Sequence, residues 1–305
     1  MKSIGQMHKE AWGILKGKWF WRLLAAGLIL QGFVYAANFA VVSALEAAGI
    51  TSVGEFIEAK LRAATAGLSY ALPTTKAYVW MSAGFLFQTF IAYVFSAIFA
   101  FGFMGLLLKA RADDDRRWLS DSMSGFARPL DVTCLMILLN IVIVLAVIAW
   151  FVLVCGVAAL CRYYANGMSA VPHFGFLSIF GIVCASMLLT LPVVYAYRQT
   201  WFIKNEDPSL AAVKCLRASR KMMKGFKMDA FLLDFSFVGW IILFAVLYAV
   251  STAATFVSHG CGAAISVIGG VFGLAAFYIL VKTLLGILVA RAVFFRELQE
   301  MQRCA

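Results

Sequence analysis

The amino-acid sequence predicts an all-α, polytopic membrane protein with six transmembrane helices and short amphipathic helices on one side of the membrane. Apolar residues make up 63% of the 305-residue chain and charged residues only 13%, whereas a soluble domain has nearer half and a quarter. The apolar residues gather in runs longer than about 18 residues, the length that crosses a bilayer. No connection is long enough for a separate soluble domain, so residues 1–305 are interpreted as one membrane domain.

Six apolar runs are interpreted as spans, and most of the charged residues lie between them. The second run is long enough to imply tilt or protrusion. Pro192 predicts a kink in the fourth run, because proline removes a backbone donor from a helix. The spans cover about residues 23–45, 79–108, 132–154, 174–197, 230–256 and 264–295.

The basic residues predict the orientation of the chain. With six spans, both terminal segments and two of the connections lie on the same side, and together they hold 21 of the 26 Lys and Arg residues. The opposite side holds four, and Lys282 falls inside the sixth span. Because Lys and Arg stay cytoplasmic, both termini are expected in the cytoplasm. The same rule explains the net charge of +11 without a nucleic-acid partner.

Three of the predicted cytoplasmic segments resemble one another. Each contains a short helical pattern, a glycine, and then aromatic and basic residues before a span. If these segments are repeats, the fold consists of three helical hairpins, and each glycine ends its helix in the left-handed conformation. The alternative is that glycine, basic and aromatic residues recur at any cytoplasmic boundary. The glycines are Gly17, Gly125 and Gly225.

Residues 205–229 predict a basic amphipathic helix on the cytoplasmic side. Asp207 is a candidate N-cap, and the helical pattern runs from Ser209 to Lys224 before Gly225 ends it. Such a helix suits the headgroup region of a membrane or a groove in the helix bundle. Anionic lipids, or a partner protein, are therefore the expected ligands of its basic residues. These residues are Lys214, Arg217, Arg220, Lys221, Lys224 and Lys227.

Polar residues inside the predicted spans are few. Asp234 lies one turn into the fifth span, level with Arg291 on the antiparallel sixth, so the two are expected to form an ion pair. Lys282 lies midway along the sixth span and is expected to contact Asn140, Gln88 or a water pocket. A proton relay or transport pathway would need an acidic partner at the depth of Lys282, and the sequence offers none.

The sequence contains no cofactor fingerprint and no nucleophile with a nearby base. His173 and His259 lack a third ligand for zinc. The acidic run 113–115 stands among arginines, so a solvated loop is expected there instead of a metal site. We therefore expect no cofactor, no bound metal and no enzymatic activity.

The last hundred residues carry a family resemblance. The runs Ser219-Arg220-Lys221-Met222-Met223-Lys224-Gly225, Phe237-Val238-Gly239-Trp240 and Ala292-Val293-Phe294-Phe295-Arg296-Glu297-Leu298 resemble a bacterial integral-membrane family known as domain of unknown function 975. The resemblance implies a helical protein of the bacterial cytoplasmic membrane and no particular activity. The family usually has Pro-Tyr in its last helix where this chain has Leu285-Gly286, so a divergent member is expected.

Two classes of function fit these observations. The first is a non-enzymatic scaffold, assembly or regulatory protein whose inner face contacts anionic lipid or a membrane-protein partner. The second is a small-solute transporter or channel that uses a polar interior around Lys282. The surroundings of Lys282 discriminate between them, because transport requires a water-accessible path to that residue.

Overall fold

The computed structural model describes residues 2–47, 75–112, 118–166, 176–261 and 263–304, and within them it is helical without strands. Six of these helices are long enough and apolar enough to cross a membrane, which confirms the predicted all-α, polytopic fold. In chain order, the helices are α1 Ile4–Leu15, α2 Lys18–Ala47, α4 Thr75–Ala112, α5 Trp118–Ser122, the 3-10 helix η1 Ser124–Ala127, α6 Pro129–Asn166, α7 Phe176–Ala196, α8 Thr200–Glu206, α9 Ala212–Met222, α10 Lys227–Phe235, α11 Val238–Cys261 and α12 Ala263–Cys304.

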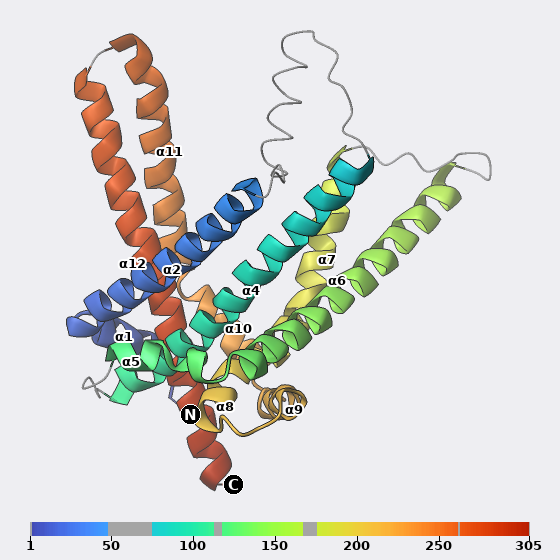
Figure 1. Ribbon diagram of the computed structural model, residues 1–305, viewed down its shortest axis with the longest axis vertical. Helices are drawn as coiled ribbons and strands as arrows, with labels where there is room; N and C mark the ends of the chain where they lie inside the picture. Colours follow the sequence, from blue (N-terminus) through green and yellow to red (C-terminus); the bar gives the residue numbers. More distant parts are fainter. Residues whose placement is uncertain (1, 48–74, 113–117, 167–175, 262, 305) are drawn as a thin grey trace.

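The long helices form three consecutive hairpins, α2/α4, α6/α7 and α11/α12 (Figure 1). Side chains tie two of these pairs together: the Gln88 amide donates to Asn38 in α2/α4, and the Ser251 hydroxyl donates to the Gly269 carbonyl in α11/α12. Short helices precede each hairpin, namely α1, then α5 with η1, then α9 with α10. This arrangement is the one expected for three hairpin repeats.

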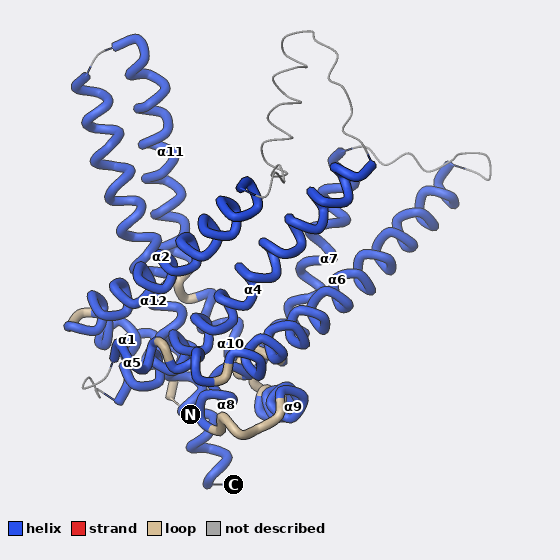
Figure 2. Tube along the Cα trace, in the orientation of Figure 1, coloured by secondary structure: helices blue, strands red, loops and turns tan. Residues whose placement is uncertain are grey.

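The buried core lies at one end of the molecule, which we call the packed end. It consists of α1, α5, α8, α9 and α10 with the adjoining parts of α2, α4 and α12. Beyond it the hairpins diverge, and α11/α12 leans away from α4, α6 and α7 (Figures 1 and 2). The diverging parts expose many large apolar side chains. A lipid environment stabilises such surfaces, whereas water does not.

Both ends of the chain belong to the packed end (Figure 1). The Lys2 ammonium lies 2.9 Å from the Glu297 carboxylate, so the start of the chain is ion-paired to the last turns of α12. Ser3 and Gln6 form a capping box that starts α1. The buried face of α1, which carries Met7, then packs against α12.

The fifth predicted span, 230–256, is interrupted. Helix α10 ends at Phe235 and α11 begins at Val238, because Ser236 and Phe237 form a turn. The Ser236 hydroxyl donates to the Leu233 carbonyl and closes the end of α10, while Phe237 is fully buried against α12. The break lets Asp234 point into the packed end, whereas α11 continues at a different angle (Figure 1).

Only one of the three glycines expected in the left-handed conformation adopts it among the described residues. Gly225 has a φ of 91° and ends the turn after α9. Gly125 instead lies inside the 3-10 helix η1, where its missing side chain lets the backbone approach the Ile98 carbonyl of α4. Gly17 follows a right-handed residue, Lys16. The expectation was therefore wrong for Gly17 and Gly125.

Gly286 of α12 lies at a close contact between helices. A Cβ atom at this position would lie 2.9 Å from the ring of Phe237 and 3.7 Å from Leu15. The absence of a side chain therefore lets α1 and the α10–α11 turn pack directly against α12.

We predict that Gly286→Leu lowers the free energy of unfolding by roughly 1–3 kcal/mol, because it overpacks this contact. Thermal unfolding of the detergent-solubilised protein measures the effect. The matched control is Gly270→Leu on the same helix, where nothing lies within 4 Å of the added Cβ. Equal melting temperatures for the two variants would contradict the packing described here.

Candidate functional site

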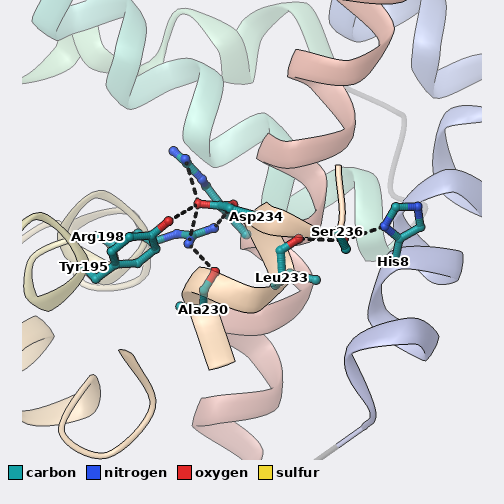
Figure 3. Close-up of polar contacts among 8 residues, drawn as sticks. His8, Tyr195, Arg198, Ala230, Leu233, Asp234 and Ser236 are labelled. Atoms are coloured by element: carbon teal, nitrogen blue, oxygen red, sulfur yellow. Dashed lines mark hydrogen bonds and ion pairs between the residues drawn. The ribbon is translucent and has the colours of Figure 1, made fainter. Parts of the chain in front are cut away.

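A charged cluster in the packed end is centred on Asp234 (Figure 3). Arg198 binds both oxygens of this carboxylate, with N–O distances of 2.8 and 2.7 Å, and its guanidinium also donates to the Ala230 carbonyl. The Tyr195 hydroxyl donates to Asp234 Oδ2 at 2.9 Å, and Arg291 contacts the same oxygen at 3.3 Å. One carboxylate therefore joins α7, α10 and α12.

The local sequence explains how the cluster forms. Tyr195 and Arg198 are three residues apart, so they project from the same side of the chain where α7 ends. The side chain of Arg198 is only 5% exposed, and a cation so deeply buried needs a paired anion. The break after α10 directs Asp234 toward it.

The predicted pairing of Asp234 with Arg291 is found, but it is the weaker of the two contacts that Asp234 makes with arginine. The sequence predicts only a contribution to orientation for Arg198, and it predicts no role for Tyr195. The spacing of Tyr195 and Arg198 at the end of the fourth span, at the same depth as Asp234, is the pattern that indicates this cluster.

Lys282 contacts neither Asn140 nor Gln88, so these two expected partners were wrong. Its ammonium lies over the rings of Trp12 and Tyr278, at 5.6 and 5.3 Å from the ring centres, and it donates to the Tyr278 hydroxyl. Such cation–π contacts are favourable for a partly dehydrated lysine. The surroundings of Lys282 in the described residues are therefore aromatic.

Lys282 also lies near the packed end. Trp12, whose ring it contacts, packs on Trp240 near the start of α11. The apolar stretch of α12 continues on both sides of Lys282, from Gly269 to Arg303, so Lys282 lies inside this stretch as the sequence indicates.

Asn140 and Gln88 bind other residues. The Asn140 amide donates to the Tyr93 hydroxyl and links α6 to α4, while Gln88 binds Asn38 as described above. Both contacts satisfy polar groups between neighbouring helices, as is usual in membrane bundles. They do not connect with Lys282.

The predicted basic residues lie on the outer side of α9, on the turn that follows it and at the first residue of α10. Cys215, Leu216, Ser219 and Met222 form its buried side, against the bundle. The apolar side of α9 is thus docked on protein and is not free to lie in lipid. Five of the basic residues are exposed and the sixth is partly so, and the described structure gives none of them an ion pair. We call these six the α9 basic surface: Lys214, Arg217, Arg220, Lys221, Lys224 and Lys227.

The start of α9 differs from the prediction. Asp207 ends α8 and accepts the Ser209 amide, so it forms a turn and does not cap α9. The reason is Lys204, whose buried ammonium donates to the carbonyls of Pro208 and Leu210 at 2.9 and 2.7 Å. These contacts fix an extended turn, and the helix begins only at Ala212.

A cavity of about 490 Å³, lined by both apolar and polar side chains, opens beside the α9 basic surface, between α8, α9 and α12. Glu206 lines it and is bound to Arg296 and Gln299 of α12. Lys221 contributes to its wall. The cavity thus places one member of the basic surface beside a carboxylate that already has partners.

His8 connects α1 to the α10–α11 turn. Its ring stacks on Phe237 with a centroid distance of 4.3 Å, and its Nδ1 lies 2.7 Å from the Ser236 hydroxyl (Figure 3). Trp12 Nε1 is a donor only, so its 2.6 Å contact requires His8 Nε2 to be an unprotonated acceptor. His8 is therefore neutral and carries its proton on Nδ1. Burial lowers its pKa in agreement with this geometry.

The described residues contain no group of three side chains suited to a metal ion. The side chains of His173 and His259 and the acidic run 113–115 fall outside the described part. The arrangement at the packed end consists of ion pairs, cation–π contacts and an unpaired basic surface. Exposed cations of this kind attract anions.

The family model described as protein of unknown function (DUF975) matches residues 1–302. The chain belongs to this family. No curated protein matches it, and no solved structure does. In this DUF975 protein the match covers the first two hairpins as well as the last hundred residues. The resemblance described in the sequence depends on the last hundred residues alone.

We predict that the DUF975 protein loses stability in acid through His8. The folded state lowers the pKa of His8 and so favours the neutral ring. This contribution is present above the unfolded pKa of about 6.5 and is lost as the pH falls below it. Thermal unfolding between pH 8 and pH 5 measures the loss.

The control is His8→Phe, which keeps an aromatic ring against Phe237 and cannot titrate. It is expected to be less stable at pH 8, because two hydrogen bonds are gone, and to lose less stability on acidification. A pH dependence identical to that of the natural protein would show that His8 plays no part.

Proposed function

We propose that this DUF975 protein is a non-enzymatic scaffold or assembly protein of the bacterial cytoplasmic membrane, whose inner face binds anionic lipid headgroups. The observation that carries the proposal is the α9 basic surface. Six basic side chains lie together on the outside of the packed end, and no described acidic residue neutralises them. Each basic residue near an anionic surface contributes about 1 kcal/mol of attraction.

The docking of α9 on the bundle supports this role. Cys215 and Leu216 are buried, so the helix is held rigidly and its charges keep a fixed spacing. A preformed charged face loses less conformational entropy on binding than a flexible tail does. An acidic protein partner would be attracted by the same charges and is the alternative ligand of this surface.

The surroundings of Lys282 favour the scaffold over a transporter. Its described contacts are to the aromatic rings of Trp12 and Tyr278. A transport pathway through the hairpin would need a polar group further from the packed end. The polar residues there that the structure describes, such as Ser251, bond to neighbouring backbone.

We predict that anionic lipid protects α9 from hydrogen exchange. The full chain is placed in nanodiscs of phosphatidylglycerol or phosphatidylcholine, and amide exchange is followed over residues 212–224. Slower exchange is expected with phosphatidylglycerol, because bound headgroups hold the helix against opening. Equal exchange in the two lipids would overturn the lipid-binding proposal.

Two triple variants sharpen this experiment. The first triple variant removes half of the α9 basic surface and is expected to abolish the lipid dependence. It combines Lys214→Gln, Arg217→Gln and Lys221→Gln. The control triple variant removes the same charge from exposed residues elsewhere at the packed end. It combines Lys9→Gln, Lys16→Gln and Arg303→Gln. The second triple variant should keep the lipid dependence.

The orientation has its own test. The pairing of Lys2 with Glu297 supports termini on the same side, and the predominance of Lys and Arg on that side supports a cytoplasmic location. We predict that a reporter that works only in the cytoplasm is active when it is fused to either end of the chain. Reporters at the two ends that signal from opposite sides of the membrane would refute both the orientation and the number of spans.

A further inference from the structure

The Asp234 cluster carries one more positive charge than negative. Arg198 and Asp234 form a complete bidentate pair, so they neutralise each other. Arg291 is then a second cation on the same carboxylate. Its contact, at 3.3 Å, is to Oδ2, an oxygen that already accepts hydrogen bonds from Tyr195 and Arg198. Asp234 therefore cannot fully satisfy Arg291.

Most of the hydrogen-bonding capacity of Arg291 is unused among the described residues. A guanidinium has five N–H donors, and Asp234 is its one bonded partner there. Its Nε is buried without an acceptor, while the side chain as a whole is 34% exposed. The excess charge therefore reaches the surface at Arg291.

An exposed apolar stripe on α12 leads away from Arg291. Leu284 and Phe277 precede it by seven and fourteen residues, so all three lie on nearly the same face of the helix. Leu284 is 51% exposed and Phe277 is 59% exposed. From Arg291 to Phe277 the stripe rises roughly 21 Å, more than the half-thickness of a bilayer core of about 30 Å.

Helix α7 offers a similar face on the other side of the cluster. Leu188 precedes Tyr195 by seven residues, so it lies on the face of α7 that turns toward Asp234, and it is 65% exposed. Leu188 and Leu284 thus stand one heptad beyond the polar cluster, on the two helices that Asp234 joins. A charged end with apolar walls beyond it matches an amphiphile.

We propose that this place binds a single anionic phospholipid, with its phosphate on Arg291 and an acyl chain along Leu284 and Phe277. The phosphate supplies the negative charge that the cluster lacks. Arginine suits phosphate because two of its N–H groups can bind two oxygens at once. Arg198 is a positioning residue, since it holds Asp234 in place while Arg291 faces the ligand.

The lipid site is separate from the α9 basic surface. It centres on Asp234, Arg198 and Arg291, whereas the basic surface lies on α9, the turn that follows it and the first residue of α10, Lys227. Loss of the diffuse headgroup attraction at α9 leaves the Arg291 site intact. The triple variant Lys214→Gln, Arg217→Gln and Lys221→Gln should therefore still hold the single lipid.

The experiment uses the full chain in a neutral detergent, titrated with phosphatidylglycerol or with phosphatidylcholine of the same acyl chains. Native mass spectrometry counts the bound lipids. Arg291→Gln is expected to weaken phosphatidylglycerol binding roughly ten-fold to a hundred-fold, the range for one lost charged hydrogen-bonding partner. The matched control is Arg296→Gln, five residues further along the same helix, where affinity should be unchanged.

The variant Leu284→Gln shows whether the ligand is a lipid or a free anion. It leaves Arg198, Asp234 and Arg291 in place and should weaken lipid binding by several-fold. It also carries the test if Arg291→Gln does not fold. If inorganic phosphate stabilises the protein as much as phosphatidylglycerol does, and stabilises Leu284→Gln equally, the lipid assignment is overturned. Equal phosphatidylglycerol affinity in the natural protein, Arg291→Gln and Arg296→Gln would overturn the site.

Discussion

The packed end depends on a single carboxylate. Asp234 holds Arg198 through two hydrogen bonds and accepts contacts from Tyr195 and Arg291, so it fixes the relative positions of α7, α10 and α12. A buried guanidinium is costly unless an anion is paired with it. The break between α10 and α11 at Ser236 leaves Asp234 on α10, inside the packed end, while α11 continues as part of a hairpin.

The same constraint explains the shape of the molecule. Ion pairs and buried polar contacts gather where water or headgroups can solvate the groups that remain, and the diverging hairpins keep apolar surfaces for lipid. Lys2 and Glu297 close the packed end by joining the two ends of the chain. His8 and Trp12 then connect α1 to the turn that follows Asp234. The proposed role as a binding scaffold rests on this asymmetry, because the charges are concentrated on one surface.

The sequence was sufficient for the fold class and for the Asp234–Arg291 pair, because counting along two antiparallel helices gives their relative depth. It was insufficient for Arg198, since a charge at the end of a span looks the same whether it is solvated or buried. It was also insufficient for the partners of Lys282, because one of them, Trp12, comes from α1, which is distant in the sequence. The late start of α9 depends on Lys204, whose contacts to the turn are tertiary and leave no local pattern.

A double-mutant cycle tests the central role of Asp234 most directly. Unfolding free energies are compared for Asp234→Asn, Arg198→Gln, Arg291→Gln and the two double variants that combine Asp234→Asn with each arginine change. The account predicts a coupling energy of up to about 3 kcal/mol between Asp234 and Arg198, and a clearly smaller one between Asp234 and Arg291. Additive effects for Asp234 and Arg198, with no coupling, would contradict it.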